Sequence, residues 1–416
     1  MRIKTNHFLS LIFVCTCFIH SFGQDFSARE SAVQLIQKGD AYLQLGNWFD
    51  ALKEYTNAIE TDPEYAEAYM KRGQLHERVY RIKQAEIDYN MAIQLNPVID
   101  IYYNERARLK ILSFDYYGAM NDINKAIDIN VSNSNYLKYR VDGFIVLGMY
   151  DDALNNLDSI LITSKNELYV LQHKTLIYIL NGDITLAELT CLSALALNDS
   201  SYLTLDLLGL INLKNKKYKD AVTWFSKAII ADSSQFVSYY NRGVCYRFLE
   251  NPELALKDIN TSIRFNNKAQ DLYFKRALLK KENGDFEGSI SDYNNAIILD
   301  SNYSEAVYNR AFTYKIMGDY WNAEKDIDLL IKNHNSRPEY WNMKGNLQIL
   351  HGNIKEALLS YNQAIYSDLN YSQAYYNRGV ANLLLNRQIQ ACEDFQESLN
   401  LGSTKAESII LHFCGY

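Results

Sequence analysis

Residues 304–337 read SEAVYNRAFTYKIMGDYWNAEKDIDLLIKNHNSR, and this 34-residue unit decides the fold because its pattern recurs along the chain. Stepping by 34 residues from Ala32 gives eleven consecutive units that end at Lys405, without insertion or deletion. The twentieth position of every unit is small: Ala51, Ala85, Ala119, Ala153, Ala187, Ala221, Ala255, Ser289, Ala323, Ala357 and Ala391. A fixed period of this length is the signature of a repeat protein in which neighbouring units share one core.

Two further positions complete the pattern of each unit. Position 8 is glycine or alanine in nine of the eleven units, with Val141 and Thr175 as the exceptions, and position 24 is usually bulky. Between them lie turns such as Gly46-Asn47 and Gly318-Asp319, which combine a glycine C-cap with an Asn or Asp N-cap for the next helix. Small residues permit the close approach of two antiparallel helices, so each unit is predicted to be a helical hairpin.

This pattern resembles the tetratricopeptide repeat, whose W-x-x-L-G-x-x-Y, A-x-x-x-F and P skeleton the units meet at most positions. The resemblance covers residues 32–405 and implies an all-α fold, a right-handed superhelical solenoid of antiparallel helix pairs. It departs where arginine or lysine replaces leucine at position 7, where the terminal proline survives only as Pro63 and Pro97, and across residues 134–200. Residues 406–416 are expected to form a helix that caps the last unit.

The N-terminus has the pattern of an export signal. Basic residues Arg2 and Lys4 precede an apolar stretch from Phe8 to Ile19 and a small-x-small motif that ends at Gly23. These features predict a signal peptide at residues 1–23, followed by a short segment at 24–31. The apolar stretch falls short of the roughly 20 residues that a transmembrane helix needs, and no later segment approaches one. We therefore expect an exported bacterial protein, periplasmic or secreted, without a transmembrane span in the mature chain.

The cysteines are also relevant to whether and how the chain is exported. The residues before Cys15 and Cys17 fit a lipoprotein signal poorly, which disfavours a lipid anchor. In the mature chain, Cys392 lies at position 21 of the last unit, and Cys414 falls where position 9 of a following helix would be. Antiparallel packing would bring these two together, so a disulfide is predicted in an exported protein, with two separate buried thiols as the alternative. Cys191 and Cys245 are interpreted as small core residues.

The resemblance implies that the first helix of each unit lines a concave groove through positions 2, 5, 6, 9, 12 and 13. Aromatic, apolar and asparagine side chains at these positions in units 7 to 11 are the candidate partner-binding residues: Tyr240, Asn241, Val244, Phe248, Phe274, Tyr308, Asn309, Phe312, Tyr376 and Asn377. Aromatic tracks of this kind are typical of interaction surfaces. The alternatives are that curvature buries the aromatic rings and that the asparagines are only solvated. Some family members grip a C-terminal carboxylate with lysine at position 5 and asparagine at position 9, but Asp142 follows Lys138 here, so that clamp is not supported.

Position 7 carries the most regular charged column. It is lysine or arginine in every unit except the sixth, which has Leu208, and position 23 is often acidic on the facing helix. A cationic ladder for an acidic ligand is one interpretation. Structural ion pairs within each hairpin are favoured, because partly buried charges are normally paired.

Composition and motifs narrow the function. The chain has 42 lysines and arginines against 49 acidic residues and no basic tail, so nucleic acid is not expected as a partner. The histidines are scattered, and no metal, phosphate-loop or nucleophile motif occurs, so no enzyme activity, cofactor or metal is predicted. The leading hypothesis is a scaffold that binds a peptide or helix of a partner protein. The alternatives are a self-associating envelope component and an accessory protein with a small-molecule or glycan pocket, and the oligomeric state stays open.

Overall fold

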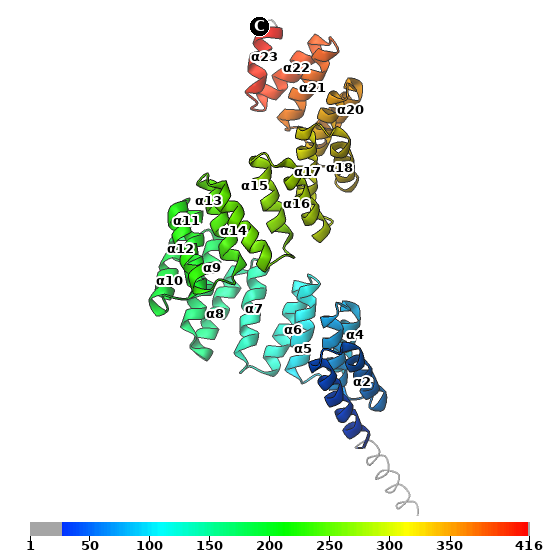
Figure 1. Cartoon of the computed structure of the whole chain (residues 1–416), viewed down its shortest axis with the longest axis vertical. Coiled ribbons are helices and arrows are strands. Elements are labelled where there is room, and N and C mark those ends of the chain that lie inside the picture. Colours follow the sequence, from blue (N-terminus) through cyan, green and yellow to red (C-terminus); the bar gives the residue numbers. More distant parts are fainter. Residues whose placement is uncertain (1–26, 415–416) are drawn as a thin grey trace, which may run out of the picture. The chain divides into compact units, whose positions relative to one another are not determined.

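The computed structural model describes residues 27–414, and every regular element in that range is a helix, which confirms the predicted all-α fold. The predicted signal peptide at residues 1–23 lies outside the described residues. The chain divides into an N-terminal unit that ends at Asn198 and a C-terminal unit that begins at Asp199 (Figure 1). Among the described residues, no helix is long and apolar enough to cross a membrane.

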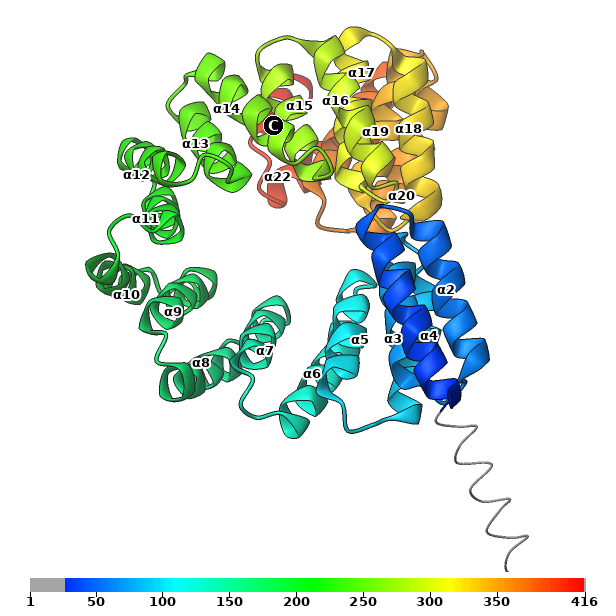
Figure 2. The same cartoon turned by 60° about the horizontal axis from the view of Figure 1, so that its bottom comes forward.

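The N-terminal unit contains the first five repeats. Their first helices are residues 27–44, α3 (Ala66–Arg78), α5 (Asp100–Leu112), α7 (Ser134–Val146) and α9 (Glu167–Asn181). Their second helices are α2 (Trp48–Thr61), α4 (Ile82–Leu95), α6 (Tyr116–Ile129), α8 (Tyr150–Ser164) and α10 (Ile184–Leu197). Within this unit α5, α7 and α9 lie on the inner side of a curve, and α6, α8 and α10 on its outer side (Figure 2).

The C-terminal unit contains the other six repeats. Their first helices are α11 (Tyr202–Lys214), α13 (Phe236–Phe248), α15 (Gln270–Glu282), α17 (Ser304–Met317), α19 (Pro338–Leu350) and α21 (Ser372–Leu384). Their second helices are α12 (Tyr218–Ala231), α14 (Pro252–Phe265), α16 (Phe286–Leu299), α18 (Tyr320–Asn333), α20 (Ile354–Ser367) and α22 (Gln388–Asn400). In both units each first helix packs on the second helix of its own repeat, and that helix packs on the first helix of the next repeat.

The turn inside each hairpin has the same backbone conformation in all eleven repeats. Position 15 has a positive φ whether it is glycine, as at Gly318 with φ 82°, or another residue, as at Phe114 with φ 62°. The following residue caps the second helix in several repeats, and the Asp319 side chain accepts a hydrogen bond from the backbone N–H of Asn322. The turn therefore imposes the left-handed conformation even where no glycine favours it.

The core confirms the close approach predicted from the small positions. All eleven residues at position 20 are buried, with at most 1% of their surface exposed. Position 8 faces the bulky side chain at position 24 of the same repeat, and a Cβ atom on Gly209 would lie 2.5 Å from Cε1 of Phe225. Five of the six aromatic residues at position 24 stand opposite glycine, the exception being Tyr293 opposite Ala277. The side chains at positions 8 and 24 are thus complementary in size where the two helices touch.

The charged column at position 7 forms the structural ion pairs that the sequence analysis favoured. In the third repeat, Nε and Nη2 of Arg106 donate to the two carboxylate oxygens of Asp122 at 2.8 and 2.6 Å. Its Nη1 donates to Oδ1 of Asn90, on the second helix of the preceding repeat, at 2.7 Å. One arginine therefore joins its own hairpin and also ties it to the hairpin before, a link that the sequence analysis did not anticipate.

Two lysines show the same link where position 23 is not acidic. Thr190 and Ser360 occupy position 23 of the fifth and tenth repeats. There Lys174 pairs with Asp158, and Lys344 pairs with Asp328, each at 2.8 Å and each on the second helix of the preceding repeat. These two lysines thus keep an acidic partner although position 23 of their own hairpin is not acidic, whereas Arg140 of the fourth repeat donates to Asn156 and Asn124 instead.

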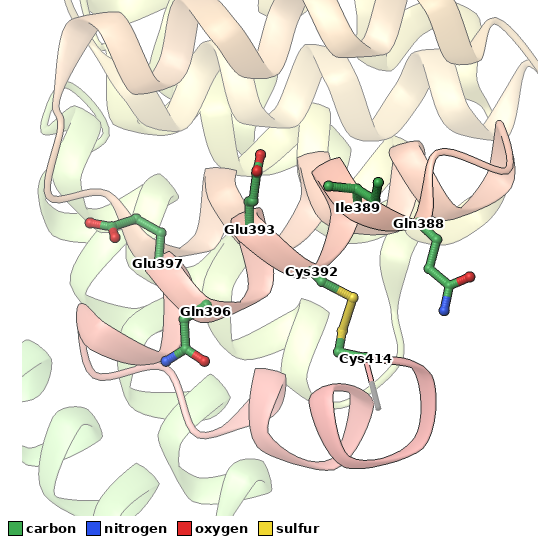
Figure 3. Close-up of a pocket in the computed structure, with 7 residues that line it drawn as sticks. All are labelled: Gln388, Ile389, Cys392, Glu393, Gln396, Glu397 and Cys414. Atoms are coloured by element: carbon green, nitrogen blue, oxygen red, sulfur yellow. A yellow bond between two sulfur atoms is a disulfide. The ribbon is translucent and has the colours of Figure 1, made fainter. Parts of the chain in front are cut away.

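The C-terminal cap is helix α23 (Lys405–Phe413). It buries Ala406 and Ile410 against Ala391 and Phe395 of the last repeat. A disulfide joins Cys392 of α22 to Cys414, the pairing that the sequence analysis expected (Figure 3). Cys191 and Cys245 are buried and not disulfide-bonded, as expected.

Gly209→Ala is expected to lower the free energy of unfolding by about 1–3 kcal/mol, because the new methyl group would overlap the Phe225 ring. The third and ninth repeats carry alanine opposite isoleucine, in the pairs Ala107/Ile123 and Ala311/Ile327. Adding Phe225→Ile to Gly209→Ala should therefore restore stability. The measurement is urea unfolding of the full chain by circular dichroism. A double variant less stable than Gly209→Ala alone would contradict the proposed size matching.

Candidate partner-binding cleft

The structure brings three of the ten expected groove residues, Tyr308, Phe312 and Asn377, into one cleft of about 570 Å³ in the C-terminal unit. The other side chains that line it are Lys315, Asn342, Met343, Asn346, Ile349, Leu350, Tyr361, Gln373, Val380 and Lys405. All but Tyr361 and Lys405 come from the first helices α17, α19 and α21. They occupy positions 2, 5, 6, 9, 12 and 13, the positions that the resemblance assigned to the groove.

Two expected groove residues are buried instead, which corrects the sequence analysis. Phe274 is 1% exposed, and its ring packs between those of Tyr293 and Tyr303, with centroids 5.9 and 5.1 Å away. Asn241 is 7% exposed. Burial of the Phe274 ring is the alternative that the sequence analysis left open for the aromatic residues, whereas burial of Asn241 fits neither a groove contact nor a solvated asparagine.

The remaining expected residues lie outside the cleft. Tyr240 and Val244 are half-buried on α13, and Tyr240 packs against the core that α14 and α15 share. Phe248 is 51% exposed and stacks on Tyr218, with ring centroids 4.6 Å apart. Tyr376 packs against the core beneath the cap. Asn309 is half-buried on α17 and accepts a hydrogen bond from Nζ of Lys281 at 3.0 Å. None of these five residues is among those that line the cleft.

Amide side chains form a connected network in the cleft. Nδ2 of Asn377 donates to Oδ1 of Asn342 at 2.8 Å and to Oδ1 of Asn346 at 3.1 Å. The Tyr361 hydroxyl donates to the same Asn346 oxygen at 2.9 Å, and Nε2 of Gln373 donates to Oδ1 of Asn377 at 3.1 Å. The network holds the amide groups in fixed orientations, because each bond restricts the rotation of two side chains.

The cleft has no carboxylate among its lining residues, although Glu339 lies near Tyr308. Oε2 of Glu339 is buried without a hydrogen-bond partner. Among the described residues, no three histidine, cysteine, aspartate or glutamate side chains are grouped so that they could hold a metal ion. The arrangement is therefore suited to hydrogen bonding and apolar contact.

Comparison with known proteins identifies the family of the 34-residue repeat. A family model described as "TPR repeat" matches residues 39–79, and one described as "Tetratricopeptide repeat" matches residues 237–268 and 338–371. The last of these matches coincides with the tenth 34-residue unit counted from Ala32. The chain is a tetratricopeptide repeat protein.

The curated relatives are repeat proteins as well. A TPR repeat-containing protein of Methanocaldococcus jannaschii is 27% identical over 223 residues, which are 49% of this chain and 39% of that protein. Human tetratricopeptide repeat protein 13 is 25% identical over 170 residues, 39% of this chain and 20% of that protein. The matches thus span less than half of the length of either relative.

Solved structures give similar matches at low identity. A tetratricopeptide repeat protein from Parabacteroides merdae aligns with 59% of this chain and 97% of its own, at 21% identity and a TM-score of 0.46. The Cut9–Hcn1 hetero-tetramer structure aligns with 97% of this chain and 94% of its own, at 14% identity and a TM-score of 0.47.

In the groove columns of the tetratricopeptide repeats the sequence analysis selected aromatic and apolar residues and only the asparagines at position 6, so it missed the amides at the other groove positions. Asn342, Asn346 and Gln373 occupy the same columns at positions 5, 9 and 2. A search for consecutive amides in these columns would have found them. Lys405 lies beyond the columns, at the start of α23, so no repeat pattern identifies it.

A second hollow of about 600 Å³ lies at the end of the last tetratricopeptide repeat, beside the disulfide. It is lined by Gln388, Ile389, Cys392, Glu393, Gln396, Glu397 and Cys414. Figure 3 shows Ile389, Glu393 and Glu397 pointing in different directions from α22. Because its polar groups do not converge, we take the cleft of α17, α19 and α21 as the candidate site.

Asp206 occupies groove position 5 of the sixth tetratricopeptide repeat but is buried. Burial raises its pKa from 3.8 to about 6, and the hydrogen bond from the Ser238 hydroxyl, at 2.6 Å, opposes that shift. The folded state therefore binds this proton more tightly than the unfolded state. The free energy of unfolding therefore falls as the pH rises from about 4 to about 6, where Asp206 loses its proton in the unfolded but not yet in the folded state. Above pH 6 the full cost of the buried carboxylate is present.

Asp206→Asn is expected to raise the free energy of unfolding at pH 7 by about 2–3 kcal/mol, because it removes the cost of a buried charge and keeps an acceptor for Ser238. At pH 4 the two proteins should differ little. Urea unfolding at both pH values measures the difference. A variant that is less stable than the natural chain at pH 7 would show that the carboxylate is stabilising where it lies.

Proposed function

We propose that this protein is an interaction scaffold that holds an extended peptide segment of a partner in the cleft of α17, α19 and α21. Tetratricopeptide repeats support such a role in general. The observation that carries the proposal is the amide network around Asn377, which lies between apolar side chains in the groove columns.

The amides suit a peptide backbone. An asparagine side chain offers a carbonyl oxygen and two N–H donors, the same groups that an extended main chain presents along its length. Asn342 and Asn346 use their oxygens to accept from Asn377, and their own Nδ2 groups remain available as donors to a peptide carbonyl. Because the network is already oriented, a bound backbone would order few side chains of the scaffold.

The apolar side chains suit the residues of such a peptide. Phe312 is 37% exposed at one side of the cleft, and Ile349, Leu350 and Val380 also line it. Alternate side chains of an extended peptide point in opposite directions, so some would contact these surfaces while the backbone meets the amides. The cleft would thus recognise a peptide by the shape and apolar character of its side chains and by hydrogen bonds to its backbone.

Replacing Phe312 and Gln373 together with alanine is expected to weaken partner binding about tenfold or more, because it removes an exposed aromatic anchor and one support of the amide network. The partner is isolated from the native host by mild cross-linking to the full mature chain, and its affinity is then measured with purified components. Phe248→Ala is the matched control, since Phe248 is an exposed aromatic outside the cleft. A partner that binds the cleft variant as tightly as the natural chain would refute the cleft as its site.

We also propose that the chain is exported as a bacterial periplasmic or secreted protein. The leader pattern at residues 1–23 supports this, and the Cys392–Cys414 disulfide is the kind of bond that persists in an oxidising compartment.

Intact-mass spectrometry of protein from the native host should show a chain that begins at Gln24 and in which Cys392 and Cys414 resist alkylation until reduced. Cys191 and Cys245 should alkylate only after unfolding, because both are buried. A chain that retains Met1, or that alkylates at Cys392 and Cys414 without reduction, would argue against export.

A further inference from the structure

Two lysines lie against the same aromatic ring at one side of the cleft. Nζ of Lys281, on α15, is 5.4 Å from the centroid of the Phe312 ring, and Nζ of Lys315, on α17, is 5.6 Å from it. Both lysines are half-buried. Lys281 also donates to Oδ1 of Asn309 at 3.0 Å. Each of the two positive charges is therefore held beside the Phe312 ring.

Neither lysine forms an ion pair with a carboxylate of residues 27–414, and the repeat pattern explains why. In the seventh repeat, Arg247 at position 12 pairs with Glu282 at position 13 of the next repeat, 35 residues later, at 2.5 and 2.8 Å. The residues that stand in the same relation to Lys281 and Lys315 are Ile316 and Leu350. These two residues are apolar, and they are 47% and 46% exposed. An exposed apolar side chain therefore occupies each position where the seventh and eighth repeats have the acidic partner of Arg247.

An unpaired pair of half-buried cations is costly for the free protein. Burial lowers the pKa of both lysines, and only the neighbouring Glu282 opposes this shift at Lys281. An anion that entered the cleft would supply the missing countercharge, and charge-assisted hydrogen bonds to ammonium groups are stronger than neutral ones. The amide donors and apolar walls beside them are suited to a peptide carrying that anion.

We propose that Lys281 and Lys315 bind the carboxylate of an aspartate or glutamate in the partner's extended segment, next to an apolar residue that contacts Phe312. This inference rests on the proposed function, because it assigns a chemistry to the peptide held in the same cleft. Lys281, Lys315 and Phe312 then act as one acidic-residue subsite, and Ile316 and Leu350 form its apolar border.

The probe is a displayed library of random heptapeptides, panned against the full mature chain and against the Lys281→Met/Lys315→Met variant. The natural chain should enrich peptides with an aspartate or glutamate beside an apolar residue, and the variant should lose that preference. Synthetic peptides from the enriched set, each paired with its Gln or Asn counterpart, are then compared by fluorescence anisotropy. The acidic form should bind the natural chain about tenfold more tightly than the amide form, and the two forms should bind the variant alike.

Two further variants separate recognition from folding. Ile316→Glu and Leu350→Glu would give the lysines the internal partners that Arg247 has, and should weaken binding of the acidic peptide while all charges and most contacts of the cleft remain. Ile316→Gln and Leu350→Gln are the size-matched controls, since they remove the same apolar contacts without adding a carboxylate. The Glu variants should therefore bind the acidic peptide more weakly than the Gln variants do, and equal binding would contradict the subsite. Circular dichroism confirms that each variant is folded.

The outcomes distinguish this inference from the proposed function. Enriched peptides without an acidic preference, or a preference that persists in the lysine variant, would overturn the subsite while leaving peptide binding intact. The absence of any enriched peptide on the natural chain would contradict both.

Discussion

The structure depends on the close approach of two helices within each repeat. The residue at position 20 is fully buried in every repeat, and the small residue at position 8 leaves room for the side chain at position 24. A hairpin built this way cannot cover its own outer apolar face, so each second helix is buried only when the next first helix packs on it. A larger residue at any of these positions would therefore disturb a hairpin and, through it, the packing of its neighbour.

The position-7 cations add a polar link to this apolar packing. Arg106, Arg276 and Arg310 each bind an aspartate of their own hairpin and an asparagine of the preceding one. The three aspartates are almost fully buried, so each needs a cation beside it. Asp122 and Asp292 have a second one, Lys110 and Lys280 at 2.8 and 2.9 Å, whereas Asp326 pairs with Arg310. The apolar contacts set the distance between helices, and the ion pairs join consecutive repeats at equivalent points.

The fold could be predicted from the sequence because it depends on the size of residues at fixed intervals. Alanine at position 20 and glycine at position 8 identify the helix contact directly, and acidic residues at position 23 identify the partner of each position-7 cation. The cleft could be predicted only in part. The groove columns were correct for eleven of its thirteen lining residues, but a column does not determine how exposed each side chain is. Phe274 is buried because it packs between the rings of Tyr293 and Tyr303, which lie outside those columns, whereas Phe312 at position 9 of the next repeat lines the cleft.

The same regularity shows how one stretch of a repeat array can acquire a binding surface. Where a cation at position 12 meets an acid at position 13 of the next repeat, as with Arg247 and Glu282, the charge is neutralised inside the protein. Where position 13 is apolar, as at Ile316 and Leu350, the protein supplies no carboxylate at that position, and one can come from a bound partner. The substitution changes no residue of the helix contact at positions 8, 20 and 24. A repeat protein can therefore change what its groove recognises while the interactions that hold its hairpins together remain the same.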